Sequence, residues 1–212
     1  MARPDHNKLV RSENDGKFLL TAARSPRFRS VQVCCCRAKT LEDLETQFGA
    51  MAFLLPDGSA FLAFRGTDLT LVGWKEDFNM SFQDIVPAQT EAAEYLKEFA
   101  AVFDGPLYLT GHSKGGNLSV YAAATASLDV QERIRAVYNY DGPGFGHSMI
   151  GSEGYLRMIP RIQTYVPESS IIGMLLEHEE PYSAVKSTQV SIFQHDVFTW
   201  EILGADFVRA PG

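Results

Sequence analysis

One turn constrains this sequence more than any other feature. Residues 107–110 read L-Y-L-T and suit a buried strand, residues 111–115 read G-H-S-K-G, and residues 117–126 form an alanine-rich run that suits a helix. A serine with a glycine two positions away on either side, between a strand and a helix, is the pattern of a nucleophile elbow. The small residues are needed because strand and helix meet closely at Ser113. The pattern predicts that Ser113 Oγ stands clear of the sheet and can act as a nucleophile.

Apolar runs and helical runs alternate along the rest of the chain. Two apolar runs, residues 50–55 and 60–64, flank the turn sequence P-D-G-S and predict a β-hairpin. Strands that alternate with helices predict an α/β fold with a mainly parallel central sheet, helices on both faces and an N-terminal antiparallel hairpin. Further strands are expected at residues 28–38, 136–140, 161–166 and 189–193, and helices at residues 41–48, 87–103 and 152–160.

Length and composition fit one domain across residues 1–212, with residues 1–27 partly peripheral. The net charge of −7 argues against nucleic acid and anionic membrane surfaces as partners. The chain has no run of about 18 apolar residues that would predict a transmembrane segment. The polar N-terminus lacks the apolar core of a signal peptide, so we expect a cytoplasmic protein. The chain ends soon after W-E-I-L at residues 200–203, where we expect another helix; either the C-terminus is truncated or this last helix is short.

The three cysteines are consecutive, at Cys34, Cys35 and Cys36. An odd, clustered number is not a disulfide framework, and zinc sites need a second, distant pair of ligands. We therefore expect no metal and no cofactor, and we expect the thiols to pack as small apolar groups in a strand. Nothing in the composition indicates the oligomeric state.

A nucleophilic serine needs a base, a group that orients the base, and donors for the oxyanion. In folds built around such an elbow the order along the chain is serine, acid, histidine. His195 directly follows the expected strand 189–193 and is the candidate base, with His147 as its rival. His178 lies among glutamates and is expected at the surface. His112, inside the turn, is expected to support the structure.

Two carboxylates are candidates for the acid. Glu168 follows the expected strand 161–166, the usual place for the acid, and Asp141 follows the strand before it, where known variants of this architecture place the acid. The alternatives are an exposed carboxylate for Glu168 and a turn residue for Asp141. Both assignments stay open from the sequence.

The oxyanion donors are expected from two backbone amides. One is Lys114, directly after the nucleophile, and the other is Thr67 in the segment F-R-G-T-D at residues 64–68. Apolar residues near these segments could bind an acyl chain or form a mobile lid, although ordinary core is the favoured interpretation for each residue taken singly. The candidates are Leu69, Ile171 and Met174.

Several segments in this order resemble the class 3 lipases of the α/β-hydrolase superfamily. They are F-R-G-T at residues 64–67, Trp74, Asp77, G-H-S-K-G-G at residues 111–116 and Y-D-G-P-G-F-G at residues 140–146. The sequence resembles still more closely a bacterial lipase-like family known mainly as a domain of unknown function. The segments that carry this second likeness are residues 141–145, S-I-I-G-M-L-L at residues 170–176 and Q-H-D at residues 194–196.

The resemblance implies an α/β-hydrolase fold with Ser113 as nucleophile, His195 as base, and Thr67 and Lys114 as oxyanion donors. Class 3 lipases carry the acid in a D-I-V-P segment, and its aspartate falls on Ser170 in this chain. Lys114 also stands where those lipases have an apolar residue, and its side chain is expected to face solvent or a carboxylate.

These observations favour a serine esterase or lipase-like hydrolase that cleaves a carboxylic ester. Its substrate would be a small acyl ester, with a lean towards lipids, while thioesters and amides use the same kind of site. The alternative is a binding or scaffold protein of the same fold with a weak or inactive site.

Overall fold

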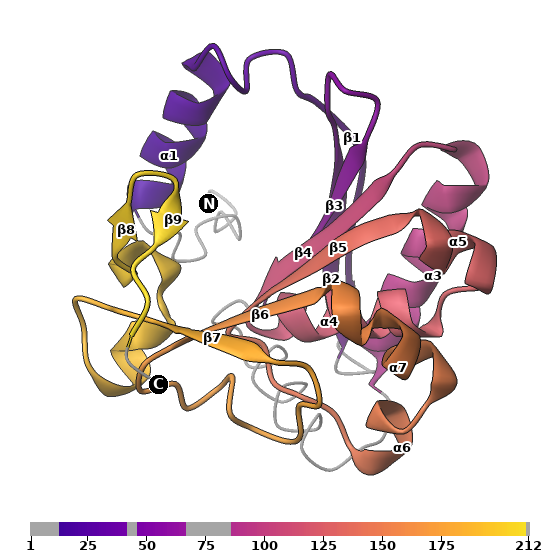
Figure 1. The fold of residues 1–212 in the computed structure, drawn as a ribbon. Helices are drawn as coiled ribbons and strands as arrows, with labels where there is room; N and C mark the ends of the chain where they lie inside the picture. Colours follow the sequence, from indigo (N-terminus) through magenta and orange to yellow (C-terminus); the bar gives the residue numbers. More distant parts are fainter. Residues whose placement is uncertain (1–12, 42–45, 67–85, 211–212) are drawn as a thin grey trace, which may run out of the picture.

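The computed structural model describes residues 13–41, 46–66 and 86–210. Within these ranges the chain folds around a seven-stranded sheet whose strands follow the order of the sequence (Figure 1). Its strands are β1 (Gln32–Leu41), β2 (Thr46–Leu54), β3 (Ala60–Phe64), β4 (Leu107–His112), β5 (Ile134–Tyr140), β6 (Ile162–Pro167) and β7 (Tyr182–Val185). A small second sheet pairs β8 (Ile202–Leu203) with β9 (Asp206–Phe207).

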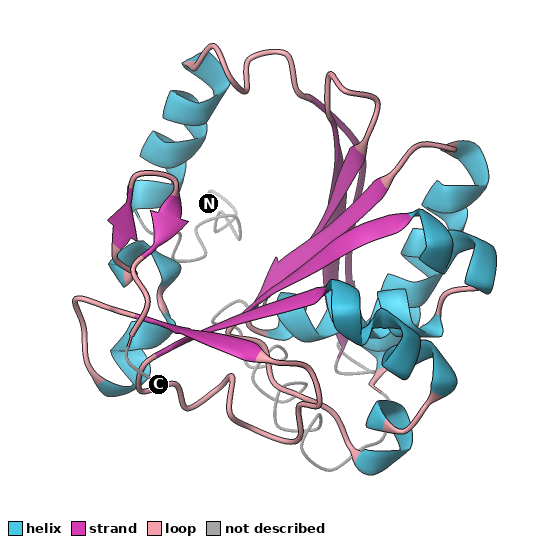
Figure 2. Ribbon diagram, viewed as in Figure 1, coloured by secondary structure: helices cyan, strands magenta, loops and turns pink. Residues whose placement is uncertain are grey.

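The α-helices are α1 (Glu13–Arg24), α3 (Pro87–Val102), α4 (Lys114–Thr125), α5 (Leu128–Arg133), α6 (His147–Ile150) and α7 (Glu153–Met158). Short 3-10 helices are η2 (Ile159–Arg161), η3 (Ser191–His195) and η4 (Val197–Thr199). The helices α3, α4, α5 and α7 lie on one side of the sheet, and α1 and the β8–β9 hairpin lie on the other (Figure 2). No helix of the described ranges is both long enough and apolar enough to cross a membrane.

The first three strands are antiparallel, and the predicted hairpin is confirmed between β2 and β3. Its turn uses Gly58 at φ 83°, and Asp57 Oδ1 accepts a hydrogen bond from the Ser59 amide at 3.0 Å. The helix expected over residues 41–48 is wrong, because Thr46 pairs with Leu41 in the β1–β2 ladder. Pairing between strands outweighed the local helical spacing of apolar residues.

The strands β3 to β7 are parallel, so their carboxyl ends meet at one edge of the sheet. One face of these strands is fully buried against the helices, with Leu62, Leu109 and Val137 at its centre. The opposite face carries a series of stacked aromatic rings that runs from Phe61 to Tyr165 across the strands. The rings are Phe61, Tyr108, Tyr138, Tyr140 and Tyr165.

The aromatic face anchors the C-terminal part of the described chain. Trp200 and Phe207 pack edge-on against Tyr140, with ring centroids 6.2 and 6.0 Å away. Burial raises the pKa of the Tyr140 hydroxyl to about 12, so this side chain stays neutral. The loop that contains η3 and η4 is thereby held beside the carboxyl end of β5.

Candidate active site

Ser113 occupies a sharp turn between β4 and α4. Its backbone has φ 58° and ψ −130°, a region that a serine adopts only when the surrounding structure enforces it. The Ser113 amide donates to the carbonyl oxygen of Tyr140 at 2.9 Å, which ties the turn to β5. A Cβ on Gly111 would lie 2.1 Å from the Gly115 carbonyl carbon, so this turn requires glycine. The residue types that mark the turn in the sequence are those that its geometry needs.

The helix α4 begins directly after Ser113 with Lys114, and the positive end of its dipole faces the turn. The Lys114 side chain is 1% exposed, so the expectation that it could face solvent is wrong. Gly66, which follows the end of β3, packs closely against the same turn. A Cβ on Gly66 would lie only 2.6 Å from the His112 carbonyl oxygen. Two further candidates, Thr67 and Leu69, lie outside the described residues, as do Trp74 and Asp77.

Asp141 lies beside Ser113 because of the strand register. The Cα partners at the ends of β4 and β5 are His112 and Tyr140, so Ser113 and Asp141 are the next residues on neighbouring strands. Asp141 also has a positive φ of 51°, and its amide donates to the Tyr165 carbonyl oxygen at 2.8 Å. Its side chain is 1% exposed and points into the protein.

His195 meets Asp141 in the structure. His195 Nδ1 lies 2.7 Å from Asp141 Oδ2, and the imidazole side chain is one-quarter exposed. The other carboxylate oxygen, Oδ1, accepts hydrogen bonds from the Ser170 hydroxyl and from the Gly173 amide, the latter at 3.1 Å. Ser170 is the position where class 3 lipases carry the acid, so it contributes a donor to the carboxylate instead. This interaction joins the ends of β5 and β6 and was not predicted from the sequence.

The strand expected at residues 189–193 is wrong, because His195 ends the 3-10 helix η3. Gln194, which is 2% exposed, satisfies the backbone of this segment: its side chain accepts from the Ser169 amide at 2.9 Å and donates to the Gln189 carbonyl at 2.8 Å. Its own carbonyl accepts from Trp200 Nε1 at 2.7 Å. These bonds fix the position of His195 and come from residues that local patterns cannot pair.

Glu168, the other candidate acid, is not brought to His195. Its backbone amide donates to the Val185 carbonyl oxygen at 2.9 Å, which continues the pairing of β6 with β7. Its side chain is exposed and forms no hydrogen bond or ion pair within the part of the chain that the structure describes. The geometry therefore matches the alternative in which Glu168 is a surface carboxylate.

His112 packs against His195 and hydrogen-bonds to its backbone. The two rings pack with centroids 4.4 Å apart, and His112 Nε2 lies 2.7 Å from the His195 carbonyl oxygen. A carbonyl only accepts, so His112 Nε2 carries the hydrogen. Burial, followed by the proximity of His195, lowers the pKa of His112 to about 4, and the ring is neutral at pH 7. Since His112 precedes Ser113, this contact places the His195 segment next to the serine.

Ser113 Oγ and His195 do not share a hydrogen bond in the described part of the structure. In unliganded active sites this contact is often longer than a hydrogen bond and shortens when substrate binds. The rival base, His147, has a side chain that is 86% exposed and pairs with Glu177 at 2.9 Å. Of the two candidates, His195 is the one that the fold places against both Asp141 and the Ser113 turn.

A second histidine–carboxylate pair lies in the interior, and the expectation that His178 is a surface residue is wrong. His178 Nδ1 lies 3.0 Å from Glu180 Oε1, and the two side chains are 11% and 1% exposed. Glu180 also accepts from the Tyr155 hydroxyl and, at 2.7 Å, from the Thr164 hydroxyl. Burial acts to raise the pKa of Glu180, but these hydrogen bonds outweigh it and hold the pKa below its usual value.

The two described candidates for substrate contact lie just past Ser170. Ile171 and Met174 are 48% and 51% exposed and flank Gly173, whose amide binds Asp141. They are therefore surface residues beside the Asp141–His195 pair and not ordinary core.

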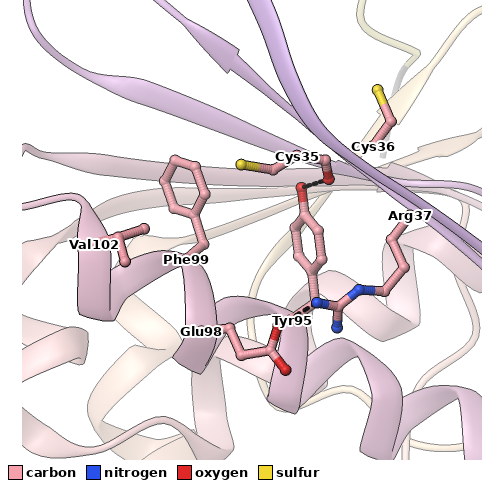
Figure 3. A pocket seen from close by; sticks show the side chains of 7 residues that line it. All are labelled: Cys35, Cys36, Arg37, Tyr95, Glu98, Phe99 and Val102. Atoms are coloured by element: carbon pink, nitrogen blue, oxygen red, sulfur yellow. Dashed lines mark hydrogen bonds and ion pairs between the residues drawn. The ribbon is translucent and has the colours of Figure 1, made fainter.

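The cysteines form a bulge on the edge strand β1, with Cys35 at φ 53° and its carbonyl bonded to the Tyr95 hydroxyl at 2.9 Å. Cys35 and Cys36 are exposed and line a hollow against α3, so the expectation that they pack inside is wrong for these two (Figure 3). The hollow also contains the ion pair of Arg37 with Glu98. Within the described ranges no group of three potential ligands is placed to hold a metal ion.

A family model described as Mbeg1-like matches residues 22–212 of the chain. No curated protein matches it. The structure is similar to that of the M37 lipase, with a TM-score of 0.54 and 16% identity over 80% of this chain and 64% of that lipase. It is also similar to a deletion mutant of Rhizomucor miehei lipase in its propeptide complex, with a TM-score of 0.51 and 15% identity over 74% of this chain and 56% of that one.

The chain spans less than two thirds of these two lipases. At this level of identity the likeness concerns the fold, and it confirms the predicted α/β-hydrolase fold with its mainly parallel sheet and N-terminal antiparallel hairpin.

Proposed function

Because the chain belongs to the Mbeg1-like family and has the fold of lipase-like hydrolases, we propose that it is a serine hydrolase that cleaves carboxylic esters. The observation that carries the proposal is the buried bond between Asp141 and His195 next to the strained Ser113 turn. In this proposal the turn is a nucleophile elbow, and Ser113, His195 and Asp141 form the catalytic triad.

Each group has a defined role in the proposed reaction. Asp141 accepts the Nδ1 hydrogen of His195, which leaves Nε2 as the atom that can take the Ser113 proton. Ser113 Oγ then attacks the ester carbonyl, and the amides of Lys114 and Thr67 stabilise the oxyanion. His195 returns the proton to the leaving alcohol, and water releases the acid from the acyl-enzyme by the same steps.

Two observations favour a substrate with a lipidic acyl group. Ile171 and Met174 expose apolar side chains next to the segment that binds Asp141. The structures with similar folds are lipases by name. We propose that these two side chains contact the acyl chain of the substrate.

A fluorophosphonate probe, read by intact mass and peptide mapping, tests the proposal without a guess about substrate. We expect a single label on Ser113, no label in Ser113→Ala, and slow labelling in His195→Ala and Asp141→Asn. Glu168→Gln is the matched control, because Glu168 is a strand-end carboxylate that does not meet His195. Failure of the folded wild-type protein to react would reject the hydrolase and favour the binding-protein alternative.

A further inference from the structure

The charge of this protein is distributed unevenly. Residues 16–41 contain six Lys and Arg residues, and all 26 Asp and Glu residues of the chain lie outside this segment. Two of the six cations, Arg37 and Lys39, pair with glutamates of α3. The other four are exposed and form no ion pair with a carboxylate of the described residues. They are Lys17, Arg24, Arg27 and Arg29.

Three large apolar side chains lie on α1 together with two of these cations, Lys17 and Arg24. Phe18, Leu19 and Leu20 are 56–65% exposed, far more than consecutive apolar residues of a packed helix. Within residues 17–24, helical geometry places them, with Ala22 and Ala23, on one side of α1, while Lys17, Thr21 and Arg24 share the other side. The first turn of α1, before this segment, contains Glu13 and Asp15. Figure 1 shows α1 apart from the helices that cover the sheet.

We propose that residues 17–29 form a docking surface for anionic lipid membranes. A short helix with an apolar side and a basic side lies in the plane of the membrane interface, with apolar groups in the acyl boundary and cations near lipid phosphates. At 12 residues α1 is too short to span a bilayer, so it would lie on the surface. The overall charge of −7 conceals this locally positive segment.

Two other occupants fit the surface less well. A nucleic acid would satisfy the cations, but it offers no apolar phase for Leu19 and Leu20. A second copy of the chain in a symmetric dimer would bring each basic segment against itself, and like charges would oppose the contact. An anionic lipid surface satisfies the cations and the apolar side chains together.

The docking surface adjoins the loop that carries His195. The Phe18 ring packs edge-on against Phe198, at 6.2 Å between centroids, and Phe198 lies on η4 three residues after His195. The same loop exposes Phe193, which is 68% accessible. Docking through α1 would therefore bring the candidate active site close to the lipid. This orientation rests on the proposed hydrolase function, whereas the docking itself does not.

Vesicle flotation of the full chain carrying Ser113→Ala tests docking without hydrolysis. We expect at least about tenfold tighter binding to phosphatidylcholine vesicles with about 30% phosphatidylglycerol than to pure phosphatidylcholine, and weaker binding at high salt. The variant Leu19→Ser/Leu20→Ser leaves the Phe18–Phe198 contact in place and should weaken binding about tenfold or more. Replacement of Lys17, Arg24, Arg27 and Arg29 by Gln should remove the preference for anionic lipid.

The matched controls lie on α3, where Val102 is 81% exposed and Lys97 is exposed. Val102→Ser and Lys97→Gln should bind vesicles as the parent does, and circular dichroism should show that every variant folds. Absence of flotation, equal binding to neutral and anionic vesicles, or equal losses in the α3 controls would each overturn the proposal. Self-association that is lost in Leu19→Ser/Leu20→Ser, without vesicle binding, would assign the surface to a second copy instead.

The orientation is tested separately in the protein with Ser113 intact. Leu19→Ser/Leu20→Ser should leave hydrolysis of a soluble short-chain ester unchanged and slow hydrolysis of an ester embedded in anionic vesicles about tenfold. Normal docking with no hydrolysis of either ester would reject the hydrolase and leave the docking surface in place.

Discussion

The described part of the protein contains two histidine–carboxylate pairs that look alike in isolation. His195 and Asp141 approach to 2.7 Å, His178 and Glu180 approach to 3.0 Å, and each carboxylate side chain is 1% exposed. They differ in what surrounds the imidazole. The His195 side chain is one-quarter exposed and lies against the Ser113 turn, whereas His178 Nε2 is buried and has no hydrogen-bond partner among the described residues.

The distance between a histidine and a carboxylate therefore does not by itself make the pair a catalytic site. A general base needs one ring nitrogen oriented by the carboxylate and the other accessible to the proton that it removes. The His195 pair has a neighbouring serine and contact with solvent. The His178 pair has hydroxyl donors from α7 and β6 around Glu180 and serves to join those elements. Substitutions that disable the two pairs should therefore affect different properties.

The variant Asp141→Asn should lower kcat/KM for a soluble ester by about 10³-fold or more. Asparagine keeps the size of the side chain but no longer favours the His195 tautomer with an accepting Nε2. Steady-state hydrolysis by purified variants measures the effect. Glu168→Gln, the matched carboxylate control, should stay within about twofold of wild type. An equal loss in both variants would remove the basis for distinguishing the two carboxylates.

The corresponding change in the second pair, Glu180→Gln, should destabilise the fold by about 2 kcal/mol and leave the Ser113 labelling rate nearly unchanged. The charged acceptor of Tyr155, Thr164 and His178 is lost inside the protein, where such hydrogen bonds contribute most. Thermal unfolding should show a melting temperature lower by about 4–8 °C. Normal stability with lost activity would mean that the second pair belongs to the active site.

His112 should make stability depend on pH. Its pKa is about 4 in the folded protein, compared with 6.5 for an ordinary histidine, so the unfolded chain binds more protons between these values. Stability is therefore complete above pH 6.5 and falls as the pH drops towards 4, by at most about 2 kcal/mol between pH 7 and pH 5. Urea unfolding at both values should show a smaller difference in His112→Asn, and an unchanged difference would show that His112 does not titrate in this way.

Local signals were enough to predict most of the fold. The P-D-G-S turn between two apolar runs and the glycines around Ser113 each impose a geometry that neighbouring residues determine. Three elements were wrong. Residues 46–48 pair with the neighbouring strand β1, and residues 191–195 are held by the bonds of Gln194 to Ser169 and Trp200. The helix expected after residues 200–203 is replaced by the hairpin of β8 and β9.

The site could be predicted only in part. Ser113 and His195 follow from a motif and from order along the chain, but two carboxylates satisfied the same rule for the acid. The choice depends on the strand register, which places Asp141 next to the Ser113 turn, and on the loop that brings His195 to it. His178 was misplaced because its flanking glutamates suggest solvent, while the donors that make its burial possible lie on α7 and β6.

A double variant within the candidate site tests which strand can supply the acid, and its expected change in activity is modest. Ser170 donates to Asp141 Oδ1, and it stands at the position where class 3 lipases carry the acid. In Asp141→Asn, the second change Ser170→Asp should place a carboxylate at the end of β6 and restore kcat/KM by about tenfold, well short of wild type. The recovery should be partial because the new carboxylate starts from the Oδ1 side and must turn to reach His195 Nδ1. Ser170→Asp in the wild-type background should lower activity, because the new carboxylate and the buried carboxylate of Asp141 repel one another. If Asp141→Asn and the double variant both fold and the double variant recovers no activity, the carboxylate that orients His195 must come from the end of β5.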